Sequence, residues 1–330
     1  MSGLTSAPTW TSPSADPNDE TFGDVVEPIE DLREAGSEYD AVLVGEPFDR
    51  GVIGRKGAAQ GPHAIRQALA GVKTHHFGGH GVGTVCDAGD AFVAVDSGDE
   101  LPETVRDLQR HLRVVAGYAH DSGAFPVFLG GDNSLTYANC LPLLGEGTLG
   151  VVNLDAHLDV RERREDATSG TPYRQLFAAG LDAYACVGAR HFETSSEYAE
   201  YVENRGGVVV TSDEVGRDVD GAAERALDAM RDVDRVYLSL DVDVLDATAA
   251  PGVSAPTPGG ITTRECFRLL HLLAHEERLA GFEVVECAPP LDREGRTVDA
   301  AARAIAHVLA GRQAGIAERA ASEEQGEATR

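Results

Sequence analysis

Three acidic motifs, each directly after a strand-like run of residues, constrain what this chain can fold into. The runs are 125–129, 149–154 and 235–240, and the motifs that follow them are 130–133 (GGDN), 155–159 (DAHLD) and 241–243 (DVD). Apolar runs of this length are typical of buried strands. When such strands lie parallel in one sheet, their carboxyl ends meet at one edge, where ligand sites of α/β folds form. The motifs should therefore converge at that edge.

Strand and helix patterns alternate between residues 39 and 312. This alternation predicts one α/β domain of three layers, in which a parallel sheet of about eight strands is covered by helices on both faces. We expect strands near 41–44, 83–86, 125–129, 149–154, 183–187, 208–210, 236–240 and 282–285, and helices near 104–119, 134–144, 195–204, 221–231, 263–275 and 298–309. Residues 1–38 should form an irregular acidic arm around Trp10 and Phe22, and residues 313–330 a flexible tail.

The charges at the expected sheet edge indicate a metal centre. Asp155, Asp159, Asp241 and Asp243 would repel one another strongly if they were crowded together without partners. Two divalent cations would balance the four charges, and oxygen-rich ligation with the single imidazole of His157 suits manganese better than zinc. The alternative is that each aspartate is only a helix cap or turn residue, which is the usual role of one aspartate after a strand.

The net charge of −27, from 55 acidic and 28 basic residues, limits the partners of this chain. It argues against nucleic acid and against anionic membrane surfaces, which both need a basic footprint. The acidic excess is spread along the chain and favours adaptation to high salt, where repulsion is screened; an ordinary acidic cytosolic protein is the alternative. Five cysteines without C-x-x-C spacing read as buried reduced thiols. With no membrane span or signal-peptide pattern, we expect a cytoplasmic protein.

Two further features have open interpretations. The glycine-rich segment 54–62 precedes a helix that contains Ile65, and it is either a plain surface loop or a loop that closes over substrate and carries Arg55. It lacks the G-K-[ST] ending of a phosphate-binding loop. The adjacent pair His75 and His76 is expected to be structural or solvent-facing rather than metal-binding, because neighbouring side chains diverge on regular structure.

The motifs resemble those of the ureohydrolase family, which comprises arginases, agmatinases and formimidoylglutamases, over about residues 40 to 312. The resemblance implies an arginase-type fold and two manganese ions per subunit that activate water. It implies that Asp155 and Asp241 bridge both ions. It also implies that Asp243 relays a proton and that Glu286, within 283–289 (EVVECAP), holds the cationic carbon centre of the substrate. The metal ligands implied are Asn133, Asp155, His157, Asp159, Asp241 and Asp243, with Asn133 and Asp159 completing one site and His157 and Asp243 the other.

Two departures from the common family pattern look like the formimidoylglutamase branch. Asn133 stands where most members have histidine, and Ser169 replaces a histidine of arginases and agmatinases. The segments 168–175 (TSGTPYRQ), 250–256 (APGVSAP) and 292–297 (DREGRT) also look like that branch. The resemblance then implies hydrolysis of N-formimidoyl-L-glutamate to L-glutamate and formamide.

The two carboxylates of such a small-molecule substrate require cations, and the candidates are Arg174, Arg190 and Arg55. We expect the enzyme to be a homo-oligomer. Agmatinase or guanidinobutyrase activity is the first alternative. A binding or regulatory scaffold with a decayed metal site is the second, and a one-zinc deacetylase on a related fold is the third.

Overall fold

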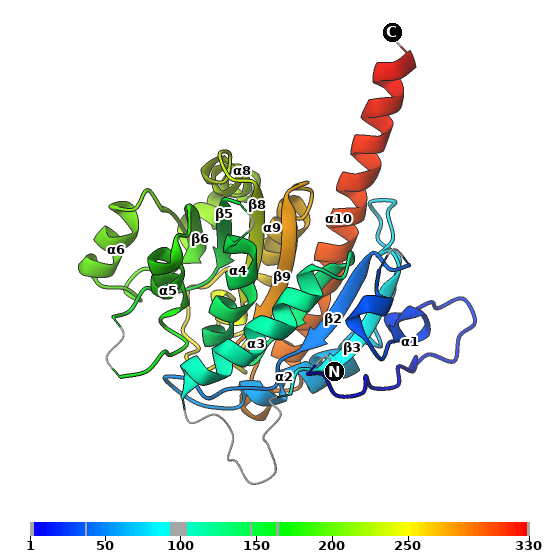
Figure 1. Cartoon of the computed structure of the whole chain (residues 1–330), viewed down its shortest axis with the longest axis horizontal. Helices are drawn as coiled ribbons and strands as arrows, with labels where there is room; N and C mark the ends of the chain where they lie inside the picture. The colour runs from blue at the N-terminus through cyan, green and yellow to red at the C-terminus, as the bar shows by residue number, and fades with distance from the viewer. Residues whose placement is uncertain (1–2, 37, 93–103, 146, 163–164, 329–330) are drawn as a thin grey trace.

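The strands of this protein form a single parallel sheet in the computed structural model, which describes residues 3–36, 38–92, 104–145, 147–162 and 165–328 (Figure 1). Within these ranges the sheet has nine strands in the order β1-β3-β2-β4-β9-β8-β5-β6-β7. The strands are β1 (Glu27–Pro28), β2 (Ala41–Gly45), β3 (Val85–Asp90), β4 (Phe125–Leu129), β5 (Leu149–Leu154), β6 (Ala183–Ala189), β7 (Val208–Thr211), β8 (Arg235–Asp241) and β9 (Leu279–Val285).

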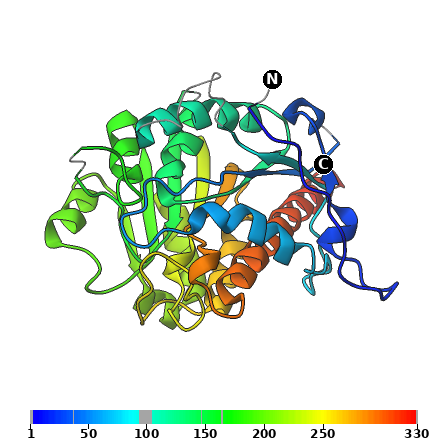
Figure 2. The same ribbon diagram turned by 90° about the horizontal axis from the view of Figure 1, so that it is seen from below.

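Helices cover both faces of the sheet, so the fold has three layers as the sequence predicts. Figure 2 shows α3 and α4 along one side of the sheet and α2, α9 and α10 along the other. The α-helices are α1 (Phe22–Val25), α2 (Gly61–Leu69), α3 (Val105–His120), α4 (Thr136–Leu144), α5 (Pro172–Ala179), α6 (Ser196–Glu203), α7 (Ser212–Arg217), α8 (Val219–Ala229), α9 (Thr263–Leu273) and α10 (Arg296–Ala328). Short 3₁₀ turns are η1 (Leu32–Glu34), η2 (Ala58–Gln60), η3 (Asn133–Leu135), η4 (Val242–Val244) and η5 (Pro289–Leu291).

Two hydrophobic cores follow from the alternation of side chains along each strand. On β2, Leu43 packs into the core shared with Ile65 of α2, whereas its neighbour Val44 packs into the core shared with Leu112 of α3. Successive residues of a strand point to opposite faces, so a strand that is apolar throughout must be covered on both sides. The continuous apolar runs of the sequence are therefore explained by burial on both faces.

The strand count differs from the sequence-based prediction of about eight because β1 lies in the N-terminal arm. This two-residue strand pairs in parallel with β3, with Glu27 opposite Cys86. It contains no apolar run, so periodicity gives no signal for it. The arm is tied down by the two aromatic residues singled out in the sequence: Phe22 is fully buried, and Trp10 Nε1 donates to Asp87 Oδ2 at 2.9 Å.

The C-terminal region differs from the loose tail expected for residues 313–330. Helix α10 continues through it to Ala328 and projects beyond the sheet (Figure 1); residues 329 and 330 lie outside the described residues. Alanine, glutamate and glutamine have high helix propensity, which accounts for the continuation. In the described part of the chain, no helix combines the length and apolar character that crossing a bilayer requires. All five cysteines are buried and free.

Candidate metal centre

Four neighbouring strands in the middle of the sheet bring the predicted site residues together. The strands lie in the order β4-β9-β8-β5, and at or shortly after their carboxyl ends stand Asn133, Glu286, Asp241 and Asp155, respectively. Because all the strands run parallel, these ends share one edge, and that edge is where the three acidic motifs converge.

The strand-end aspartates act both as turn residues and as members of the cluster. Asp155 Oδ1 accepts a hydrogen bond from the His157 N–H at 2.7 Å, and Asp241 Oδ1 accepts one from the Asp243 N–H at 2.9 Å. These are side-chain caps of the kind that the alternative interpretation predicts. They do not exclude a metal role, because each cap fixes the direction in which the carboxylate faces the cluster.

Two overlapping groups of side chains have the spacing of metal ligands. Asp155, His157 and Asp243 form one group, and Asp155, Asp159 and Asp241 form the other, with candidate ligand atoms within 4.8 Å of one another in each. Asp155 belongs to both groups, which is the arrangement that a bridging carboxylate requires. The backbone is strained here: Asp159 and Glu286 have φ angles of 45° and 63°, in the left-handed region that non-glycine residues seldom adopt.

The carboxylates of the centre carry more negative charge than their surroundings neutralise. Burial and the nearby Asp155 charge raise the pKa of Asp159 well above its usual range, and burial and Asp243 do the same for Asp241. Burial opposes protonation of His157, but the Asp243 carboxylate, 3.1 Å from Nδ1, and Asp155 raise its pKa. The protein alone thus holds protons where divalent cations would relieve the repulsion.

Asn133 faces the same cluster from η3. Its Nδ2 donates to Asp159 Oδ2 at 2.5 Å, and its backbone N–H donates to Glu286 Oε1 at 3.0 Å. Glu286 Oε2 is buried without a hydrogen-bond partner. Burial, and the charge of Asp132 next to it, raise the pKa of Glu286. The acid therefore presents one unsatisfied oxygen that a cationic group could pair with.

A cavity of about 140 Å³ opens over the centre. Gly54, the first residue of the glycine-rich segment, lines it together with the preceding Ile53, and the chain just before them is fixed by a hydrogen bond from the Gly51 N–H to Asp132 at 2.7 Å. A Cβ at Gly131 would lie 1.7 Å from the Phe48 carbonyl oxygen, so only glycine allows this close passage of the chain. The other residues around the cavity are His157, Asp159, Arg161, Ser169, Gly170, Asp241, Asp243, Ser254, Ala255 and Glu286.

The three arginines proposed from sequence do not line this cavity. Arg55 donates to the backbone carbonyls of Val253 and Ser254. Arg174 donates to the Val160 carbonyl at 2.7 Å and lies over the Tyr201 ring.

Arg190 is buried behind the centre, where its guanidinium donates to the backbone carbonyls of Thr257 and Asp243. Burial opposes ionisation of Asp243, but His157 and then Arg190 outweigh it and lower the pKa of that carboxyl. Arg190 thus helps to lower the pKa of Asp243 from a position behind the cavity wall.

Two charged residues at the site, Arg161 and Glu193, belong to none of the motifs from which the site was predicted. Arg161 lines the cavity, and among the described residues its guanidinium makes no hydrogen bond or ion pair. Its place two residues after Asp159 is the one signal that could have pointed to it. Glu193 lies 3.6 Å from His157 Nε2 and accepts a hydrogen bond from Thr257 at 2.6 Å. It belongs to an irregular segment after β6, where no pattern indicates a function.

Comparison with known proteins places this centre in a family. Residues 39–311 match the Arginase family. The chain belongs to the arginase family. It is 57% identical over 308 residues to a formimidoylglutamase of Halobacterium salinarum, an alignment that covers 92% of this chain and 98% of the relative. The crystal structure of formimidoylglutamase from Bacillus subtilis is similar with a TM-score of 0.80 and 28% identity, covering 91% of this chain and 94% of that one.

A second solved relative bears on the metal. The structure of Trypanosoma cruzi formiminoglutamase with Mn²⁺ is similar with a TM-score of 0.78 and 26% identity, covering 89% of this chain and 98% of that one. In this arginase-family chain the donor set fits such an ion, because the two ligand groups contain carboxylates and one imidazole and their charge is not neutralised by the protein.

Proposed function

We propose that this chain is a formimidoylglutamase, which hydrolyses N-formimidoyl-L-glutamate to L-glutamate and formamide. The observation that carries the proposal is the 57% identity, over nearly the whole of both chains, to a protein of that name. The cavity supports it, because it combines an acid suited to an amidinium, Glu286, with a cation suited to a carboxylate, Arg161. An amine substrate such as agmatine would be repelled by Arg161, because its positively charged amine requires an anionic partner.

The proposal includes two manganese ions per subunit. Asp155 and Asp241 would bridge them, Asn133 and Asp159 would complete one site, and His157 and Asp243 the other. When bound, the ions would lower the pKa of water and so supply a nucleophile at neutral pH. The two ligand groups that share Asp155 support the bridging role of that residue, and Asp241 belongs to the group with Asp155 and Asp159.

The residues of the chain account for the remaining requirements of the reaction. Glu286 pairs with the amidinium and holds its carbon over the centre through the oxygen that has no other partner. A water oxygen forms a bond to that carbon, and the bond from the carbon to the glutamate nitrogen breaks. Asp243, which lies beside His157 in the same cavity, takes the proton of the attacking water and gives it to the leaving nitrogen.

Arg161 is our preferred anchor for a substrate carboxylate. It is exposed at the cavity wall, and its guanidinium is free of partners among the described residues. Arginine binds carboxylates in a bidentate way, which fixes orientation as well as supplying charge. The three arginines expected from sequence are already engaged with backbone carbonyls, so they would have to give up those contacts to bind substrate.

A substrate panel tests the proposed activity. The enzyme would be assayed with manganese in molar KCl on formimidoyl-glutamate, agmatine, guanidinobutyrate and arginine. We expect the highest kcat/KM with formimidoyl-glutamate. A higher kcat/KM with agmatine or guanidinobutyrate would overturn the assignment and leave only membership of the family.

Asp241→Ala should lose manganese and turnover together; retention of half the activity would contradict the dimanganese mechanism.

We also propose that the enzyme is a cytoplasmic homo-oligomer. Five buried free cysteines suit a reducing compartment. The side chains of Phe77 and Phe192 are almost completely exposed, and such residues are common at subunit interfaces. Light scattering of the purified protein in molar KCl would give the mass, and a monomer would contradict the assembly.

A further inference from the structure

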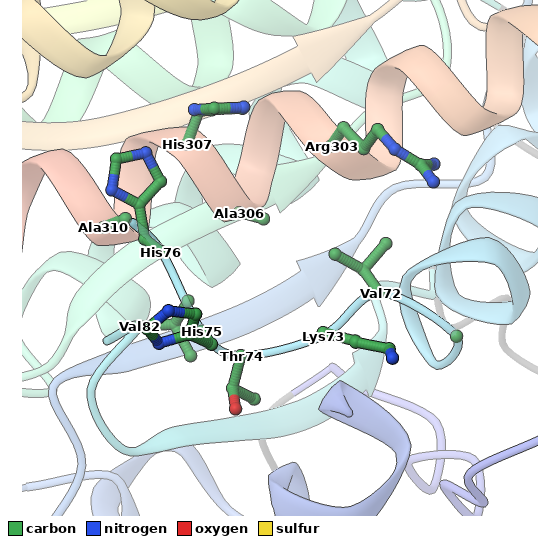
Figure 3. A pocket seen from close by; sticks show the side chains of 11 residues that line it. Val72, Lys73, Thr74, His75, His76, Val82, Arg303, Ala306, His307 and Ala310 are labelled. Atoms are coloured by element: carbon green, nitrogen blue, oxygen red, sulfur yellow. The ribbon is translucent and has the colours of Figure 1, made fainter. Parts of the chain in front are cut away.

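Three histidines far apart in the sequence meet on the side of the molecule covered by α2, α9 and α10. His76 comes from the loop between α2 and β3, His271 from α9 and His307 from α10. One ring nitrogen from each lies within 4.8 Å of the others. Figure 3 shows the rings of His76 and His307 close together at one end of a pocket, and their centroids are 5.5 Å apart. None of the three belongs to the carboxylate centre.

Two nitrogen atoms of the triad are buried without hydrogen-bond partners, whereas Nδ1 of His76 accepts from the Gly78 N–H at 3.1 Å. Nδ1 of His271 and Nδ1 of His307 are both buried and unpaired, as is Nε2 of His275, one helical turn after His271. A buried polar atom without a partner is costly, typically by 1–3 kcal/mol. Several such atoms in one place call for a ligand that bonds to imidazole nitrogen.

The two helix-borne imidazoles of the triad, His271 and His307, favour the neutral form, which binds metal. Burial, and then the neighbouring His76 and His271, lower the pKa of His307 to about 4. Burial and the neighbouring His275 lower the pKa of His271 as well. A neutral imidazole keeps a lone pair on one nitrogen and is the commonest metal ligand in proteins.

We propose that His76, His271 and His307 form a second metal site, which binds one zinc ion or another divalent ion that prefers nitrogen ligands. The triad contains no carboxylate, so it should favour such ions over manganese. Three protein ligands leave a fourth position of a tetrahedral ion open. That position would face the adjoining cavity of about 360 Å³, which Lys73, Arg303 and His307 help to line.

Binding requires a modest rearrangement that the fold allows. Nitrogen ligands of a tetrahedral zinc ion lie about 3.3 Å apart, so the present spacing of up to 4.8 Å must shrink. The rings of His76 and His271 are stacked with centroids 4.8 Å apart, and one of them must rotate before both can face one ion. His76 lies in a loop and can make this change, whereas His271 and His307 are held by two packed helices.

The charges around the triad set the expected affinity. Arg268 is near His271, but Asp220 pairs with it at 2.9 Å. The charge of Arg303 contributes to the lowered pKa of His307, but Arg303 is exposed to solvent, which screens its charge. His275, which packs against His271, lies 3.7 Å from Glu318. The nearest cations are thus paired or solvated, and they weaken binding without preventing it.

Metal content of matched variants tests the proposal. The full-length protein, loaded with manganese, would be dialysed against zinc and analysed for both metals. We expect the wild type to bind one more zinc ion per chain than a His271→Gln/His307→Gln variant. His75→Gln is the control, because His75 is adjacent to His76 but outside the triad. Equal zinc content in the wild type and the double variant would overturn the proposal.

Two further readouts do not depend on enzyme activity or on the double variant. Cobalt in place of zinc should give the visible absorption of a tetrahedral ion with nitrogen ligands, and the single loop variant His76→Gln should lose it. Zinc should also raise the melting temperature of the wild type and of His75→Gln but not of His76→Gln, because the ion ties a loop to two helices. A cobalt spectrum that is unchanged in His76→Gln would show that the triad does not bind metal.

Discussion

The amide nitrogen of Asn133 lies 2.5 Å from a carboxylate oxygen of Asp159, so the asparagine side chain faces the carboxylate cluster. Its oxygen accepts a hydrogen bond from the Thr136 hydroxyl at 2.7 Å. A hydroxyl can donate or accept. If the amide turned over, Thr136 would accept from Nδ2, and Oδ1 would face the cluster. Thr136 thus supports either orientation, and Asn133 can ligate through oxygen without losing this contact.

We predict that Asn133→His retains or improves manganese binding. Asparagine Oδ1 and histidine Nδ1 stand at the same number of bonds from Cβ, and imidazole is the stronger ligand. Manganese content and affinity would be measured by dialysis for the wild type, Asn133→His and Asn133→Ala. The alanine variant should lose manganese from one site. A histidine variant that binds less manganese than the wild type would count against ligation at this position.

The cavity predicts different kinetic effects for two arginines. Arg161→Gln should raise the KM for formimidoyl-glutamate by about tenfold to a hundredfold, with a smaller effect on kcat, because a charge-assisted hydrogen bond to a carboxylate contributes roughly 1.5–3 kcal/mol. Arg190→Gln should lower kcat instead, because Arg190 contacts the Asp243 carbonyl and stands behind the cavity wall. Steady-state kinetics would separate the two.

Arg174→Gln is the matched control for that experiment. Its guanidinium lies over the Tyr201 ring, 3.9 Å from the ring centroid, and it does not line the cavity. It should affect stability more than KM. If Arg174→Gln raised KM more than Arg161→Gln, the anchor expected from sequence would be right, and helix α5, which carries Arg174, would have to move when substrate binds.

The residues whose position at the sheet edge could be predicted from the sequence share one physical property. Asp155 and Glu286 directly follow buried strands and Asp241 ends one, so their place at the sheet edge is fixed by the strand pattern and the parallel topology. The arginines were harder, because a long flexible side chain reaches several partners and its direction depends on tertiary contacts. β1 was missed because a strand of only two residues, Glu27 and Pro28, has no periodicity.

The histidine triad is a second group of residues whose proximity could not be predicted from the sequence. The sequence favours a structural or solvent-facing role for His75 and His76, and the proposed metal site departs from that expectation for His76, whose ring stacks on His271 while His75 contacts Phe77. The sequence contains nothing that brings His271 and His307 to the same place, since that contact depends on how α9 packs against α10. Sequence patterns predict which residues lie at strand ends. They do not predict which residues meet through a loop or through the packing of two helices, and this cluster depends on both.

We predict an unusual pH dependence from Glu46. Burial, and less strongly the nearby Glu283, raise its pKa to about 8. The folded protein then keeps a proton that the unfolded chain releases above roughly pH 4.5. Its contribution to stability is therefore lost progressively as pH rises from 4.5 through 8. Glu46→Gln removes this titration, and its unfolding free energy should fall less between pH 6 and pH 9, by on the order of 2 kcal/mol.

Urea unfolding at several pH values would measure this effect. Asn139 donates to Glu46 at 2.9 Å, and a glutamine oxygen can accept the same bond, so the variant should fold. Glu200→Gln, on the exposed side of α6, is the control and should follow the wild type. Parallel pH profiles for the wild type and Glu46→Gln would mean that Glu46 is ionised in the folded protein.

The last prediction concerns salt. Even if every lysine and arginine paired with an acid, 27 negative charges would remain without partners. Exposed ion pairs such as Arg268–Asp220 also weaken in salt, but such pairs contribute only up to about 1 kcal/mol each. Screening of the excess charge should therefore dominate, and the melting temperature should fall as KCl is lowered from molar to about 0.1 M, where the screening length grows to roughly 10 Å. Sucrose in place of KCl is the control, because it stabilises by exclusion without screening charge. A melting temperature that stays flat across the KCl series would rule out adaptation to high salt.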